Sequence, residues 1–340
     1  MSIITSAPGK TILFGEHAVV YDKIGIACAI DKRCFVRVSF TPEDNIFIEA
    51  KNLNLRQSLS KEKLFEKYSL LNNLIKEKNF LKLKELTKKE KLLPSFFVIA
   101  NILKKYGFEG LKVEIASEIP KNLGSSSAVF SAIALAVSKI LGKDLSKKEI
   151  SDFAFQGDVI AHGGMPSGID NNVVTYGGYI QFRKSEGVKF LNIDFQLPLI
   201  IVDSGEPAKT AETVLAVREL REKEPEFVIP ILDKLEEISL AGIGALKLKN
   251  LPQIGKLMTD YYLELRKLGI STKKLDEIFN LALENKALGA KPTGGWGGGC
   301  CLVLAKGKKE SLNLIRVFEE KGFQTLKTKL GVEGVKRENA

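Results

Sequence analysis

The sequence predicts a two-domain protein that mixes helices and strands, an α+β fold. Its 340 residues exceed the length at which a single hydrophobic core usually stops growing. The first 50 residues are rich in short β-type segments, whereas residues 208–285 show the periodicity of long helices. This change in character predicts an N-terminal domain over residues 1–195 and a C-terminal domain over residues 196–340.

Strands and hairpins are expected between residues 3 and 50, where β-branched and apolar runs alternate with turn residues. The run TILFGEHAVVY is assigned to these strands, although residues 15–17 interrupt its apolar pattern. Residues 61–106 follow a helical pattern instead. The apolar stripe of LPSFFVIANILKKYG ends at Gly107, which is a typical stop for a helix.

The middle of the chain predicts a strand, a loop and a helix in succession. LKVEIASEI alternates as a half-buried strand does, PKNLGSSS forms the loop, and Val129, Ile133 and Val137 lie on one helical stripe. A second helix is expected over residues 147–155. The segments DNNVVTYGGYIQF and VKFLNI then resemble paired strands.

The C-terminal part begins with PLIIVDSG, a short buried strand. Long helices follow over residues 208–285, and we expect Pro225 and Pro230 to mark breaks between them. GCCLVLAKG, a helix over residues 310–321, and FQTLKTKLG complete a strand, helix, strand pattern.

Charge and composition limit the classes of partner. The chain has 51 Lys and Arg against 41 Asp and Glu, and this net charge of +10 favours anionic partners. Basic residues are not interleaved with aromatic ones, so we expect no nucleic-acid partner. Neither a signal peptide nor an apolar run of roughly 20 residues is evident. These features predict a cytoplasmic protein with no membrane partner.

Cysteine and histidine usage argues against a zinc site. No CxxC spacing occurs among the four cysteines, and only His17 and His162 are available as imidazole ligands. We therefore expect four reduced thiols: Cys28, Cys34, Cys300 and Cys301.

PKNLGSSS places a glycine and three hydroxyls where a strong helix begins. Free backbone N–H groups and the positive end of the helix dipole converge on such a loop, and Gly124 lets the backbone approach a ligand closely. An anion or a magnesium-bound phosphate would bind there. The alternative is a plain serine N-cap on a core helix, and the loop alone leaves both interpretations open.

Lys10 follows a Pro-Gly turn in SAPGKTILFGEH, at the start of an apolar strand. A standard P-loop is absent, because that motif needs a glycine where this chain has Ile4. The loop HGGMPSG closes on Asp170, which is either a general base, a metal ligand or an Asx-turn residue. AKPTGGWGGGCC carries a third, glycine-dense loop that serves a sharp turn or a close backbone approach to a ligand.

SAPGKTILFGEH, PKNLGSSSA and KPTGGWGGGC together resemble the three signature motifs of the GHMP kinases, small-molecule kinases named for galactose, homoserine, mevalonate and phosphomevalonate. The resemblance covers nearly the whole chain. GEHAVVY and HGGMPSGIDNNVVTYGG are most similar to the mevalonate kinases within this family. The resemblance to the GHMP kinases implies a ribosomal-protein-like α/β domain at the N-terminus, a ferredoxin-like α/β domain at the C-terminus, and an active site in the cleft between them.

The resemblance also implies a reaction. ATP would phosphorylate the primary hydroxyl of mevalonate with the help of Mg²⁺. Asp170 would act as the base, Lys10 would stabilise the transferred charge, and Ser126 and Asp158 would hold the metal. Positioning and charge neutralisation are most of what phosphoryl transfer requires.

Binding residues follow from the same resemblance. The acceptor pocket would be lined by Glu16, His17 and Thr210, with Lys209 as a candidate partner for a carboxylate. Trp296 stands where the family usually has a small residue, so we expect its indole to point away from the nucleotide or the loop to take another path. The ATP phosphates would contact Pro120, Leu123, Gly124, Ser125, Ser126, Ser127, Gly294, Gly295 and Gly297.

Three questions stay open at this point. Another GHMP kinase, acting on phosphomevalonate or on a different hydroxyl, is the nearest alternative. A non-catalytic RNA-binding protein is a distant one. The sequence does not choose between a monomer and a homodimer.

Overall fold

The computed structural model describes residues 2–164 and 166–339. One long sheet organises the first part of the chain. Its strands are β1 (Ser2–Phe14), β2 (Gly25–Phe40), β3 (Asn45–Ala50), β4 (Leu55–Ser60), β5 (Leu111–Ser117), β6 (Tyr179–Arg183), β7 (Gly187–Leu191) and β12 (Lys336–Arg337). Their order is β12-β1-β2-β5-β3-β4, and β6 pairs with both β2 and β7.

β1 and β2 are single long strands where the sequence predicts several short ones. They pair in antiparallel fashion from Ser2↔Ser39 to Phe14↔Ile26, with irregularities after Pro8 and after Ile12. GEHAVVY does not continue the strand. A 3₁₀ turn, η1 (Ala18–Tyr21), follows β1 instead. The chain turns at Gly15, whose φ of +105° and close approach to Gly25 leave no room for a Cβ.

The helices that belong with this sheet are α1 (Lys61–Lys76), α2 (Phe80–Lys89), α3 (Leu93–Tyr106), α4 (Ser125–Ile140), α5 (Lys147–His162) and α6 (Ile169–Tyr176). The stretch predicted to be helical before Gly107 is confirmed, and Gly107 caps α3. Nearly every side chain of α4 is buried, so a single apolar stripe was too narrow a prediction. α4 contacts β1 and β2 on one side and α3, α5 and α6 on others.

α6 corrects the expected strand at DNNVVTYGGYIQF. Residues 169–176 form a helix, and the strand begins only at Tyr179, after two glycines with positive φ. Val173 and Val174 have the local character of a strand, but both are buried where α6 packs on α4 and α5. Tertiary packing therefore overrides the local β propensity.

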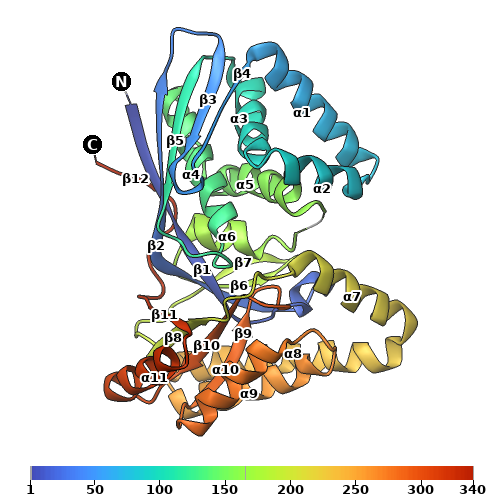
Figure 1. Ribbon diagram of the computed structural model, residues 1–340, viewed down its shortest axis with the longest axis vertical. Coiled ribbons are helices and arrows are strands. Elements are labelled where there is room, and N and C mark those ends of the chain that lie inside the picture. Colours follow the sequence, from blue (N-terminus) through green and yellow to red (C-terminus); the bar gives the residue numbers. More distant parts are fainter. Residues whose placement is uncertain (1, 165, 340) are drawn as a thin grey trace.

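A second, four-stranded sheet carries the C-terminal part (Figure 1). Its antiparallel order is β11-β8-β10-β9. With the helices between them, these strands follow the β-α-β-β-α-β pattern of ferredoxin-like folds. The elements are β8 (Leu199–Asp203), α7 (Thr210–Lys223), α8 (Pro225–Lys247), α9 (Leu251–Arg266), α10 (Lys273–Glu284), β9 (Gly289–Thr293), β10 (Cys300–Leu304), α11 (Lys308–Glu320) and β11 (Gln324–Lys327).

Only one of the two prolines breaks a helix as predicted. Pro225 is the first residue of α8, where a missing N–H costs nothing. Pro230 lies inside α8 and does not end it. Both Pro230 and Glu226, whose carbonyl loses its partner there, are exposed, so water can satisfy the freed group.

After β11 the chain returns to the first sheet. β12 pairs with β1 at Ser6↔Lys336, and Gly177 forms an isolated bridge with Glu333. The side chain of Arg33 donates hydrogen bonds to the carbonyls of Glu333 and Gly334. Lys336 and Arg337 of the proposed domain 196–340 thus lie on the sheet of the proposed domain 1–195.

The four cysteines are free and buried, as predicted. Across residues 2–164 and 166–339, no helix has both the length and the apolar character needed to cross a membrane.

Candidate active site

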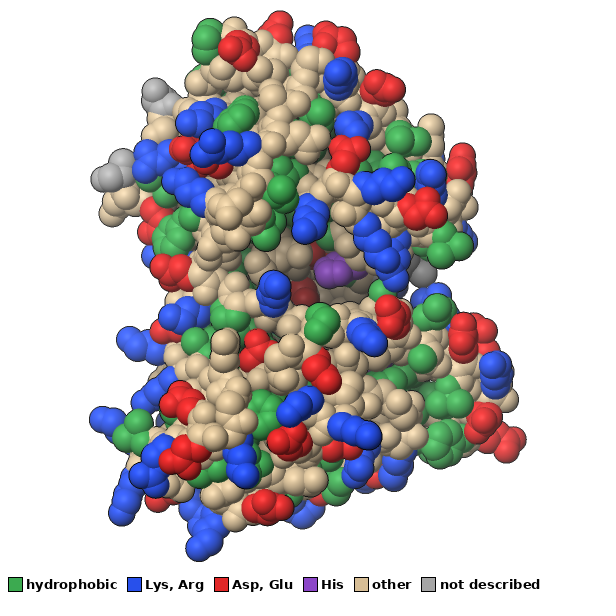
Figure 2. All heavy atoms as spheres, viewed as in Figure 1, with side chains coloured by type: hydrophobic (Ala, Val, Ile, Leu, Met, Phe, Trp, Pro, Cys, Tyr) green, Lys and Arg blue, Asp and Glu red, His purple; other side chains and the backbone are tan. Residues whose placement is uncertain are grey.

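The three motifs meet where the two sheets join. The backbone N–H of Lys10 donates to the carbonyl of Leu123 at 2.9 Å. The hydroxyl of Thr293 accepts from the N–H of Ile12 at 3.0 Å and donates to its carbonyl at 3.1 Å. Figure 2 shows a hollow between the upper and lower halves of the molecule, with histidine and acidic side chains inside it.

The serine loop leaves a helix end uncapped. Gly124 is the N-cap of α4 in the left-handed conformation, at φ +77°, and no side chain in the described part of the protein caps the helix. The alternative of a plain serine N-cap is therefore wrong. Ser125 and Ser126 are partly exposed in the first turn, so their N–H groups and hydroxyls remain available to an anion.

Ser127, predicted to contact the phosphates of ATP, has a buried side chain. Its hydroxyl donates to Oδ2 of Asp158 in α5 at 2.6 Å, and both side chains are buried. The pKa of Asp158 is raised to about 8, mainly by burial and further by the charge of Asp170, while the hydrogen bond from Ser127 and the charge of Lys10 act in the opposite direction. Oδ1 of Asp158 has no hydrogen-bond partner in the described part of the chain. Nε2 of His162 lies 3.8 Å from Oδ1. A hard cation bound at Oδ1 would replace the proton that the raised pKa favours.

Lys10 and Asp170 form an ion pair of 2.9 Å between Nζ and Oδ1. Lys10 comes from β1 and its side chain is 4% exposed, whereas Asp170 lies in the first turn of α6 and is 34% exposed. The carboxylate therefore has one face on the lysine and another open to solvent. The two residues predicted to carry the chemistry are brought together.

Glu16 and His17 lie buried in the turn after β1. His17 Nε2 is 3.0 Å from the carbonyl oxygen of Gly295. A carbonyl can only accept, so Nε2 carries the proton and Nδ1 is left as an acceptor. Burial lowers the pKa of His17 to about 4, which keeps the ring neutral near pH 7.

Thr210 packs closely against the glycine loop. A Cβ added to Gly295 would lie only 2.0 Å from the Thr210 hydroxyl oxygen. Thr210 and Lys209 are exposed at the start of α7. Thr213, which no sequence motif marks, donates to the carbonyl of Gly295 at 2.5 Å. Lys209 lies beside the loop at Gly297.

The glycine loop faces the serine loop, with Gly294 and Gly299 close to Asn122. Gly294 and Gly297 both have positive φ. Trp296 is fully buried and stacks on Tyr262 of α9, with ring centroids 5.8 Å apart. Its indole points into the second domain, as expected of a residue that must leave the loop surface free.

Lys291 is the most important residue that sequence reasoning missed. Its fully buried ammonium is hydrogen-bonded to Oε1 of Glu16 and, at 2.8 Å, to the carbonyl of Pro292. The sequence marks it in two ways, as the first residue of the motif KPTGGWGGGC and as a lone lysine in the apolar strand GAKPT. A charge there needs a partner, but the sequence does not say which one.

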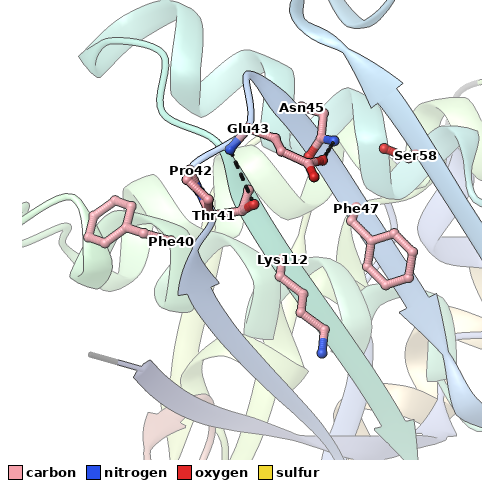
Figure 3. Close-up of a pocket in the computed structure, with 8 residues that line it drawn as sticks. All are labelled: Phe40, Thr41, Pro42, Glu43, Asn45, Phe47, Ser58 and Lys112. Atoms are coloured by element: carbon pink, nitrogen blue, oxygen red, sulfur yellow. Dashed lines mark hydrogen bonds between the residues drawn. The ribbon is translucent and has the colours of Figure 1, made fainter.

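A separate pocket of about 360 Å³ lies at the far end of the first sheet, around the turn between β2 and β3 (Figure 3). Phe40, Phe47 and Lys112 contribute to its lining. None of the motif residues is among the described residues that line it.

Comparisons with known proteins agree with the motifs. The family model for the GHMP kinases N terminal domain matches residues 94–178, and the model for GHMP kinases C terminal matches residues 243–324. A mevalonate kinase from Pyrococcus furiosus is 37% identical over 99% of this chain and 99% of its own. One from Archaeoglobus fulgidus is 33% identical over 95% of this chain and 99% of its own.

Solved structures confirm the predicted two-domain fold. The Methanococcus jannaschii mevalonate kinase matches with a TM-score of 0.79 at 27% identity, covering 97% of this chain and 98% of that one. The L. major enzyme in complex with R-mevalonate matches with a TM-score of 0.75 at 23% identity over 98% of this chain and 96% of that one, and shows the fold alone. The chain belongs to the GHMP kinase family. Its place within that family is among the mevalonate kinases.

Proposed function

We propose that this protein transfers the γ-phosphoryl group of ATP to the primary hydroxyl of mevalonate, giving 5-phosphomevalonate. The observation that carries the proposal is the Lys10–Asp170 ion pair, which lies between the uncapped end of α4 and the turn carrying Glu16 and His17. Relatives that are mevalonate kinases along their whole length support the same acceptor.

Asp170 is suited to act as the base. Its partly exposed carboxylate can reach a hydroxyl in the hollow and accept its proton as the new bond to phosphorus forms. The side chain of Lys10 packs against Gly124 of the serine loop, and its ammonium lies 2.9 Å from the Asp170 carboxylate. There it stabilises charge that develops on the transferred group.

The phosphates of ATP are expected at the first turn of α4 and the facing glycine loop. Gly124 allows this approach and brings the turn against the side chain of Lys10. Ser126 and Asp158 are the proposed holders of Mg²⁺, and the bare Oδ1 of Asp158 supports that role. When bound, the ion would neutralise charge on the phosphates.

A coupled assay with ATP and a panel of acceptors tests the proposal. We expect turnover with mevalonate, and much less with phosphomevalonate. No turnover of mevalonate by intact protein that binds an ATP analogue would overturn it. Turnover of phosphomevalonate instead would point to the neighbouring branch of the family.

A further inference from the structure

Lys291 and Glu16 join the two halves of the molecule through a buried ion pair. Glu16 follows β1 of the first sheet, whereas Lys291 lies within β9 of the second sheet, opposite Leu302. Neither side chain is exposed to solvent. A buried pair of this kind is a poor source of stability, because its desolvation offsets much of its attraction, so stability alone does not explain it.

Three contacts fix the geometry of the pair. The Lys291 ammonium lies 5.3 Å from the centroid of the Tyr261 ring and donates to the Pro292 carbonyl at 2.8 Å. The hydroxyl of Tyr261 in turn donates to the backbone carbonyl of Glu16 at 2.8 Å. These contacts restrict the position of the Lys291 ammonium and, through it, of Oε1 of Glu16.

The second oxygen of Glu16 is left bare. Oε2 is buried and has no hydrogen-bond partner among residues 2–164 and 166–339. Nδ1 of the adjacent His17 is also buried and lacks a partner in the same described ranges. Buried acceptors without donors are uncommon, and two on consecutive residues indicate that a ligand supplies the donor.

We infer that Lys291 is a positioning residue that holds Glu16 to accept a hydrogen bond from the hydroxyl of the acceptor that is not phosphorylated. This inference rests on the proposed function, since mevalonate carries a tertiary hydroxyl besides its reacting primary one. In this role Lys291 acts through Glu16 and needs no contact with the acceptor. It fixes one carboxylate oxygen so that the other faces the acceptor.

The test compares mevalonate with 5-hydroxy-3-methylpentanoate, which lacks the tertiary hydroxyl, in the wild type and in Lys291→Met. The wild type is expected to favour mevalonate in kcat/KM by at least about tenfold, the size of one well-made hydrogen bond. Lys291→Met should reduce that preference to about threefold or less while the affinity for an ATP analogue stays within about twofold. Lys291→Arg should restore part of the preference.

Arg183→Met provides the matched control. Arg183 of β6 forms an ion pair with Glu236 of α8 at 2.5 Å, so it also joins the two halves but lies outside the motifs. The Arg183→Met substitution should lower the melting temperature of the protein and leave its preference between the two acceptors unchanged. If Lys291→Met behaves in the same way, Lys291 is only a structural brace and the inference is wrong.

Two further outcomes are decisive. If Lys291→Met fails to fold, the double variant Glu16→Gln/Lys291→Met, which removes both buried charges, is tested in its place. A wild-type preference in that double variant would overturn the inference, and its loss would support it. A wild type that binds the ATP analogue but phosphorylates neither acceptor would refute the proposed function, and with it this inference.

Discussion

Asp170 and Lys10 are distant in sequence but form one ion pair, and each is held by a different element. Asp170→Asn keeps the shape of the side chain but removes its capacity to accept a proton. We expect kcat to fall at least about 100-fold, which is typical for loss of a general base. Steady-state kinetics with mevalonate and ATP would measure this.

The matched control for that variant is Asp152→Asn on the exposed side of α5, which should change kcat little. Binding of an ATP analogue, followed by thermal shift, should survive in Asp170→Asn. Retention of most of the wild-type kcat would show that Asp170 is not the base.

His17 makes stability depend on pH. Its pKa is about 4 in the folded protein and 6.5 in the unfolded chain, so the unfolded state binds more protons between these values. Stability should therefore be complete above pH 6.5 and fall as the pH drops toward 4, by up to about 3 kcal/mol from this residue.

Urea unfolding at pH 7 and pH 5 would measure that effect, with His17→Gln as the comparison. The wild type should lose more free energy of unfolding than the variant between the two values. Equal losses would mean that His17 titrates normally.

Single residues were predictable where a motif marks them. Lys10, Asp170 and the two loops carry such marks, and the structure brings them together. Lys291 stands in the third motif, but its pairing with Glu16 could not be predicted, and neither could the Ser127–Asp158 contact, because both depend on which strands and helices meet. A lysine in a strand has no local feature that identifies its partner.

At the scale of elements, the junction between the serine loop and α4 allows a test of the proposed phosphate site. Gly124 has φ +77°, and a Cβ there would lie 2.6 Å from Cγ of Lys10. Gly124→Ala should therefore displace both the helix end and the lysine. We expect KM for ATP to rise at least about tenfold and kcat to fall, because backbone donors and a charge are misplaced together.

Gly142→Ala is the control for backbone strain. Gly142 follows the other end of α4 at φ +69°, and no described atom lies within 4 Å of the position that a Cβ would take. The substitution should cost about 1 kcal/mol of stability and leave KM for ATP unchanged. Similar kinetic changes in both variants would remove the special role of Gly124.

The element predictions succeeded where the hydrophobic period was long and regular. The helices from residue 61 to 106 and the strands around Pro198 and Cys300 are examples. They failed at η1 and α6, which are only four and eight residues long. In such segments the local pattern is ambiguous, and packing against α4, α5 and α8 decides the conformation.

The return of the chain to the first sheet was not predictable at the scale of the whole molecule. β12 is only two residues long, and its partner β1 is at the opposite end of the sequence. Arg33 strengthens this contact by donating to Ser6 as well as to the carbonyls of Glu333 and Gly334. No local sequence pattern predicts this pairing of β12 with β1.

Arg33→Met should loosen this returning segment. The carbonyls would lose their donors, which we expect to cost about 2 kcal/mol of stability. Amide hydrogen exchange over residues 330–338 should quicken, while the second sheet is unaffected. Arg37→Met, on the exposed side of the same strand, should change neither quantity. Unchanged exchange in Arg33→Met would show that β12 holds without it.

The pairing of β12 with β1 also has a consequence for the order of events during synthesis. β1 is made before β12, its neighbour on the outer side, and the rest of both sheets and the helices α1 to α11 are translated between them. Until then β1 presents an open edge, which is a site for unwanted pairing with other chains. At Thr5 and Ser6 the nascent protein is therefore open to such pairing until Arg337 and Lys336 join them.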